Sequence, residues 1–359
     1  MSGWQTVGSE AARCSPHRWL RLTAVVLFAL LFAIHDEARP RDLDAPFHEF
    51  MGSQEQIRAN LQTFEVWRTR SAVPQHVGFD TIPQLAPPVY RILTPAIMYT
   101  VSHLPHPHSC LAAVRLLLIT GFLLLVYLLS RAWLTEAGAA TAMVLTAALL
   151  YDVPIPAIET RLHAVLMTGA LMLLVAQRTA PLLVVYTLAA LNREDALLIA
   201  LAAALVWLLS RTGHDRRLLW TALACVGISV GIRAVAIAVV GHRPYYTDVV
   251  QLTHNLSMLK YSVGAGNFLH PDLNVVLPLF VMAAMSLVAY RSKPSQLQAG
   301  PLVFWLYLAS VLVIGRFHEV NKYPPLIAFV MPGVIWSLLP SLRRHERSLA
   351  GKTGDGSCQ

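Results

Sequence analysis

Two neighbouring carboxylates, Asp36 and Glu37, directly follow an apolar run that ends at Ile34. A carboxylate can take the proton from a hydroxyl group when burial or a second carboxylate raises its pKa. Either residue is therefore a candidate general base, and the sequence does not choose between them. Paired acids after an apolar helix also arise by chance, so the alternative is an ordinary pair of boundary charges.

A second polar group, residues 192–195 with the letters NRED, interrupts two apolar runs. The run before it, 180–191, makes a helix of only about 18 Å at 1.5 Å per residue, short of the roughly 30 Å of bilayer hydrocarbon. We therefore expect this turn to lie below the membrane surface, where Arg193 would be a poorly screened cation suited to a phosphate or carboxylate. The alternative is an ion pair of Arg193 with Glu194 or Asp195 that makes a short turn tolerable.

The sequence predicts no metal site. His103, His106 and His108 are separated by prolines and have no carboxylate near them, so we interpret them as part of an interfacial loop. The four cysteines lie far apart and form no CxxC pair. Nucleotide binding is not expected either, because the chain contains neither a P-loop nor a GxGxxG motif.

The composition is that of a membrane protein. Of 359 residues, 55% are hydrophobic and only 13% are charged, whereas soluble domains carry about a quarter charged residues. Apolar runs such as 111–130 and 218–240 are long enough to cross the bilayer as helices. We predict an all-α polytopic membrane protein. The net charge of +8 does not indicate a nucleic-acid partner, because the basic residues stand singly between the apolar runs.

About ten transmembrane helices are predicted, with both chain ends in the cytoplasm. They are 23–34, 111–130, 137–150, 163–177, 180–191, 196–210, 218–240, 275–290, 299–315 and 323–340. Residues 89–104 are amphipathic and are expected to lie along the membrane surface. This arrangement collects basic residues on the cytoplasmic side, as short cytoplasmic loops do.

The predicted topology gives one transmembrane domain, 19–340, between a disordered cytoplasmic N-terminus, 1–18, and a cytoplasmic tail, 341–359. Two long loops, 35–110 and 241–274, are predicted on the extracytoplasmic side, whereas the cytoplasmic connections between spans are short. The first of these loops is expected to carry helices that lie along the membrane surface. Ionisable side chains that lie within the depth of the membrane usually face a polar cavity. We therefore expect the functional site on the outer face.

Four segments, in this order, resemble glycosyltransferases of the GT-C type that use polyprenyl-phosphate sugars, the group of the protein O-mannosyltransferases and the aminoarabinose transferase of lipid A. They are Asp36-Glu37-Ala38-Arg39, Pro87-Pro88-Val89-Tyr90, LAALNREDALL and Asn321-Lys322-Tyr323-Pro324-Pro325. The similarity runs from about residue 20 to 340. The chain lacks that family's C-terminal soluble domain, and Glu159 stands where the family has an aspartate, so Glu159 either replaces it or that role is missing.

The resemblance implies transfer of a sugar from a polyprenyl-phosphate donor to an extracytoplasmic glycan, lipid or protein, with inversion. Asp36 or Glu37 would be the base, and Arg193, Arg316 and Lys322 would bind the donor phosphate. Further substrate-binding residues would be Tyr90, Arg91, Glu159, Arg161, Asn192, Glu194, His318 and Glu319. A divalent metal is left open, membrane lipids are expected partners, and a bacterial inner membrane is the expected location.

Two other classes remain open from the sequence. One is a transporter or flippase of a lipid-linked or anionic solute, for which the internal repeats typical of such proteins are not seen. The other is a polymerase or ligase of surface polysaccharide, which would share the large outer loops but use other catalytic positions.

Overall fold

The computed structural model describes residues 16–38, 53–76, 78–152, 158–210, 215–245, 250–253, 255–257, 271–314 and 323–344. Within these ranges the regular elements are α-helices and short 3-10 helices, and the β contacts are two isolated bridges. The described part of the chain is therefore all-α, as the sequence predicts.

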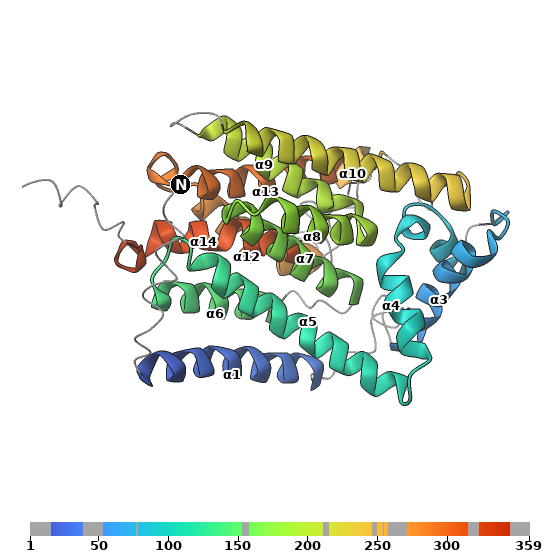
Figure 1. Cartoon of the computed structure of the whole chain (residues 1–359), viewed down its shortest axis with the longest axis horizontal. Coiled ribbons are helices and arrows are strands. Elements are labelled where there is room, and N and C mark those ends of the chain that lie inside the picture. Colours follow the sequence, from blue (N-terminus) through green and yellow to red (C-terminus); the bar gives the residue numbers. More distant parts are fainter. Residues whose placement is uncertain are drawn as a thin grey trace, which may run out of the picture.

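Five helices are long and apolar enough to cross a membrane. They are α1 (Pro16–Ala38), α5 (Pro107–Ser130), α7 (Ile158–Val175), α10 (Arg216–Val240) and α13 (Ser295–Ile314). Their apolar windows differ in burial, with 56% of the α7 window buried but only 17% of the α1 and α10 windows. In the bundle of Figure 1, α7 is therefore an inner helix, whereas α1 and α10 lie at the periphery with faces open to lipid.

The other five predicted spans are shorter helices, so a count of ten is not confirmed. They are α6 (Glu136–Asp152), α8 (Thr179–Asn192), α9 (Leu197–Leu209), α12 (Pro271–Met285) and α14 (Ile327–Leu338). The segment predicted at 323–340 begins as a 3-10 turn, η8 (Pro324–Leu326), because two prolines at its start donate no backbone hydrogen bonds. The segment predicted at 275–290 ends early, and Ala289 beyond it takes a left-handed conformation.

Residues 89–104 do not form a long helix. They fold into the end of η4 (Pro88–Tyr90) and into α4 (Leu93–Ser102), which at ten residues is about 15 Å long. With α3 (Ser53–Thr69), which packs against it, α4 lies at the right-hand end of the molecule in Figure 1, near the C-terminal ends of α1 and α10. The 3-10 helix η3 (Phe79–Gln84) joins these two elements at the same end.

The core of the bundle is built by α7, which packs against α5 and α8, and by α9, which packs against α10 and α13. Buried alanines such as Ala164, Ala170 and Ala203 let these helices approach closely. Tyr186 of α8 also bonds Ser229 of α10 through their hydroxyl oxygens, 2.5 Å apart. Small residues and interhelical hydrogen bonds are how helices associate in lipid, where apolar surface alone gives no preference.

Gly300 marks a close contact between α13 and α14 and gives the first testable prediction. A Cβ atom at this position would lie 2.0 Å from the carbonyl oxygen of Phe329, so α13 and α14 could not keep their present spacing. We expect Gly300→Ala to destabilise the protein by about 1–3 kcal/mol, the usual cost of overpacking. Thermal unfolding in detergent measures it, with Gly231→Ala as the control, because nothing lies within 4 Å of a Cβ there. Equal midpoints for the two variants would contradict the packing described.

Candidate functional site

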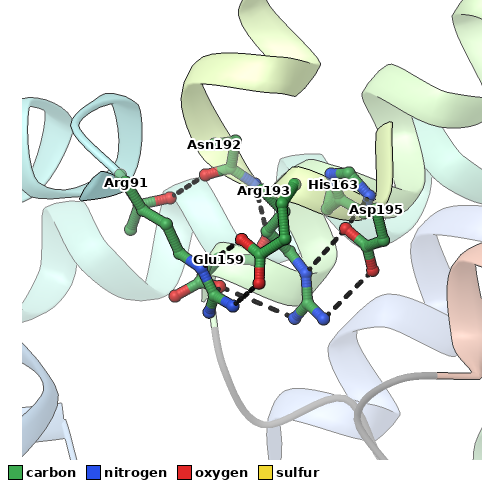
Figure 2. A network of polar contacts seen from close by, with 8 residues as sticks. Arg91, Glu159, His163, Asn192, Arg193 and Asp195 are labelled. Carbon is green, nitrogen blue, oxygen red and sulfur yellow. Dashed lines mark hydrogen bonds and ion pairs between the residues drawn. The ribbon is translucent and has the colours of Figure 1, made fainter. Parts of the chain in front are cut away.

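Charged and polar residues from three distant stretches of the chain meet near one end of the long helices (Figure 2), and the end of α1 is tied to the same part of α7 through the ion pair of Asp36 with Arg161. The three stretches are the residue after η4, the first turns of α7 and the turn between α8 and α9. The described members are Asp36, Arg91, Glu159, Arg161, His163, Asn192, Arg193, Glu194 and Asp195. We call these nine residues the polar network.

Arg91 is the hub of one half of the polar network. Its Nε and Nη2 atoms donate to the two carboxylate oxygens of Glu194 at 3.0 and 2.6 Å, and its Nη1 lies 2.7 Å from Oε1 of Glu159. Burial alone would raise the pKa of Glu194, but the charge of Arg91 and its hydrogen bonds outweigh burial and lower that pKa to about 2. Arg91 therefore ties the segment after η4 to α7 and to the α8–α9 turn.

Arg193 is the central residue of the other half of the polar network. Its Nε and Nη2 atoms lie 3.2 and 3.1 Å from the two carboxylate oxygens of Asp195, and its Nη1 is 3.5 Å from Glu159. Only 7% of the Arg193 side chain is exposed. Arg193 is thus paired rather than poorly screened, which favours the ion-pair alternative for the NRED turn.

His163 extends this half into the interior. Its Nε2 atom lies 2.8 Å from Oδ1 of Asp195, within ion-pair distance although outside hydrogen-bond geometry, and the ring is fully buried. Burial alone would raise the pKa of Asp195, but Arg193 and His163 together hold it well below its usual value. Asp195 is therefore an anion between two basic side chains.

Asn192 fixes the backbone around the polar network. Its amide nitrogen donates to the carbonyl oxygen of Glu159 at 2.9 Å, and its amide oxygen accepts from the hydroxyl of Thr94 at 2.5 Å. The backbone N–H of Ile92 also donates to the carbonyl of Leu191. These bonds hold α4, α7 and the end of α8 in register, so Asn192 positions its neighbours through buried contacts, and its predicted role in substrate binding stays a prediction.

Asp36 is held by Arg161. The Oδ2 atom of Asp36 lies 2.9 Å from Nη2 of Arg161, whose Nη1 also donates to the backbone carbonyl of Arg115 at 3.3 Å. The Arg161 side chain is 1% exposed and that of Asp36 is 10% exposed. A buried guanidinium therefore fixes the carboxylate at the exit of α1. Glu37 belongs to α1, but its side chain lies outside the described residues.

Part of the polar network contacts α5 well inside the end of that helix. Arg115, whose carbonyl accepts from Arg161, is eight residues inside α5 after Pro107, which corresponds to about 12 Å along the helix axis. The adjacent α8 has only 14 residues. The short α8 thus ends before its longer neighbours do, and the depth of the NRED turn in a membrane stays a prediction.

Of the predicted residues that the structure describes, Tyr90 stands apart from the polar network. Tyr90 contacts none of its charged groups; its hydroxyl accepts from the backbone N–H of Arg243 at 2.9 Å, next to the end of α10. Arg316, His318, Glu319 and Lys322 lie outside the described residues. The adjoining turn η8 packs against α7, which carries Glu159 and Arg161.

Sequence reasoning did not select His163 or Asp195 as site residues. His163 lies four residues after Glu159, a spacing that places both on one face of α7, but an isolated histidine in an apolar run carries no further signal. No group of three or more His, Cys, Asp or Glu side chains arranged to hold a metal occurs among the described residues. Comparison of the chain with protein-family models, curated proteins and solved structures finds no match.

The lowered pKa of Glu194 gives a prediction about pH. Because its pKa is about 2 in the folded protein and near 4.5 when unperturbed, the stabilisation from Glu194 is complete above pH 4.5 and is lost as the pH falls towards 2. We expect wild type to melt at a higher temperature than Glu194→Gln at pH 6, with the gap narrowing towards pH 3. A gap that stays constant over this range would contradict the assignment.

Proposed function

We propose that this protein is a membrane glycosyltransferase that moves a sugar from a polyprenyl-phosphate donor to an extracytoplasmic acceptor hydroxyl. The observation that carries the proposal is the polar network itself. Three of the four segments that resemble the GT-C family contribute to it or adjoin it directly, through Asp36, through Arg91 after η4 and through Arg193. The fourth, at Tyr323 and η8, packs on α7.

Asp36 is the proposed general base. Its carboxylate would accept the proton of the acceptor hydroxyl while the hydroxyl oxygen bonds to the anomeric carbon. The bond from that carbon to the phosphate oxygen breaks on the opposite side, so the configuration inverts and the lipid phosphate leaves with the electron pair. Arg161 would serve as a positioning residue, because its buried guanidinium fixes Oδ2 of Asp36. Glu37 remains the alternative base.

The charges of the polar network restrict where the donor phosphate can bind. It contains three guanidinium groups, of Arg91, Arg161 and Arg193, against four carboxylates, of Asp36, Glu159, Glu194 and Asp195. It therefore has no surplus positive charge for a phosphate. We assign the departing phosphate mainly to Arg316 and Lys322, with Arg193 in a supporting role through its edge towards Glu159.

The proposed setting is a multi-pass protein of a bacterial inner membrane with this site facing outwards. The donor would enter from the lipid, the acceptor would be a glycan, lipid or protein outside the cytoplasm, and nucleic acid plays no part. Nucleotide is not required, because the sugar arrives on its lipid carrier. A divalent metal is not assigned.

Purified protein in detergent, given labelled polyprenyl-phosphate sugars and solubilised envelope glycans and lipids as acceptors, tests the proposal. We expect the label to leave the polyprenyl phosphate and to appear on an acceptor. The transporter alternative gives a different result, namely movement of intact donor across proteoliposomes without cleavage. Intact donor under all of these acceptor conditions, together with such movement, would overturn the transferase assignment.

A further inference from the structure

Arg233 is a cation on a lipid-facing helix. It lies seven residues before Val240, the last residue of α10, or about 10 Å inside the helix end. Val230 and Ile237, about one turn before and one turn after it, are 63% and 36% exposed, so Arg233 lies at the edge of the lipid-facing side of α10. A charged side chain inside an apolar stretch of helix is unfavourable unless a partner compensates it.

The described contacts of Arg233 do not include a carboxylate. Its guanidinium carbon lies 4.7 Å from the centre of the Tyr90 ring, a cation–π contact that compensates part of the cost. Among the described residues no Asp or Glu lies within ion-pair distance of it, whereas Arg91, Arg161 and Arg193 each pair with at least one. Arg233 thus keeps hydrogen-bond donors for an anion from outside the protein.

The position of Arg233 connects the lipid to the polar network. Ser229 lies one helical turn before Arg233 on the same face of α10 and bonds Tyr186 of α8. Arg233 therefore lies one turn beyond this contact between α8 and α10. Tyr90, which its guanidinium covers, is followed in the chain by Arg91, the hub of the polar network. An anion bound at Arg233 would therefore lie between the bilayer and the proposed transfer site.

We propose that Arg233 and Tyr90 form an entry site for the phosphate of a membrane lipid that arrives sideways from the bilayer. A guanidinium binds phosphate through two parallel hydrogen bonds, and the Tyr90 ring holds its plane from one side. The identification of that lipid as the polyprenyl-phosphate donor rests on the proposed function. This residue adds a cation to a site whose own charges leave none in surplus.

Lipid binding to protein in nanodiscs tests this inference without any transfer reaction. Native mass spectrometry would count polyprenyl monophosphate bound in phosphatidylcholine discs, and a second arm would use phosphatidylglycerol. We expect Arg233→Gln to bind polyprenyl monophosphate about tenfold more weakly than wild type. Arg233→Lys, which keeps the charge but loses the two-point geometry, should fall between them. The matched control is Arg216→Gln, an exposed arginine at the opposite end of the same helix.

The outcomes separate this inference from the proposed function. Wild-type binding that Arg233→Gln leaves unchanged, or wild type that binds neither lipid, overturns the entry site even if sugar transfer is found. Binding that depends on Arg233 upholds the entry site even if no transfer is found. Dependence on Arg233 for phosphatidylglycerol alone identifies bulk headgroups as the ligand and overturns the assignment to the donor.

Discussion

Replacing Asp36 by Asn is expected to lower the rate of sugar transfer by about 100-fold or more, the contribution of a general base to a proton transfer. The substitution keeps the shape of the side chain and its contact with Arg161, whose guanidinium lies 2.9 Å from Oδ2. The variant loses the ability to accept a proton and also the negative charge that pairs with Arg161, while its amide oxygen can still accept a hydrogen bond from that guanidinium. Donor binding should therefore change little, and the loss should appear in the turnover rate.

Glu65→Gln is the matched control for Asp36→Asn. Glu65 lies on α3 and is ion-paired with Arg68, but its side chain is 48% exposed and it is not part of the polar network. We expect this variant to transfer sugar at the wild-type rate. Full activity of Asp36→Asn, with Glu37→Gln also active, would remove both carboxylates from the mechanism. Loss only in Glu37→Gln would move the role of base to the neighbouring residue.

Replacing Arg91 by Met is expected to cause the largest loss of stability, about 3 kcal/mol. Removing one partner of a partly buried ion pair leaves a poorly compensated charge, and here Glu159 and Glu194 both lose their principal cation. Glu194 is 40% exposed, so water offsets part of the cost. The measurement is the midpoint of thermal unfolding in detergent.

Arg68→Met is the control for Arg91→Met, because Arg68 holds Glu65 through the same two-point geometry at 2.9 and 2.6 Å but on the surface. Its midpoint should stay close to that of wild type, since exposed ion pairs contribute little to stability. Adding Glu194→Gln to Arg91→Met should recover part of the lost stability. Similar midpoints for the two single variants would show that the polar network does not hold the segments together.

The sequence predicted the long helices and the short α8 because both depend on the length of apolar runs. It did not predict where single residues shorten a helix. The segment that leads into α14 begins as a 3-10 turn at Pro324, and α12 ends before Ala289, whose backbone is left-handed. Hydropathy alone treats a proline or a left-handed residue as part of an apolar run. This is why the predicted spans at 323–340 and 275–290 are shorter in the structure.

The partners of the charged residues could not be predicted from the sequence. Candidate site residues such as Asp36, Arg91 and Arg161 were selected by residue type and by their place between apolar runs. Spacing along the chain does not show which helices are neighbours in the fold. The pairing of Asp36 with Arg161, 125 residues apart, follows from the packing of α1 and α7 around α5. Arg193 shows the limit most clearly, since its carboxylate partner removes the free cation that the sequence suggested.

Sidedness is the most direct test of the claim that the polar network serves a donor outside the cytoplasm. Cys110 lies in the first turn of α5, at the same end of the helices as the polar network, and is partly exposed. In protein that keeps only this cysteine, a membrane-impermeant maleimide should label Cys110 in intact cells. Protein with Glu136→Cys as its single cysteine, at the start of α6 and bonded to Arg21 at the opposite end of α1, should react only after permeabilisation. The reverse pattern would place the polar network in the cytoplasm and contradict the account.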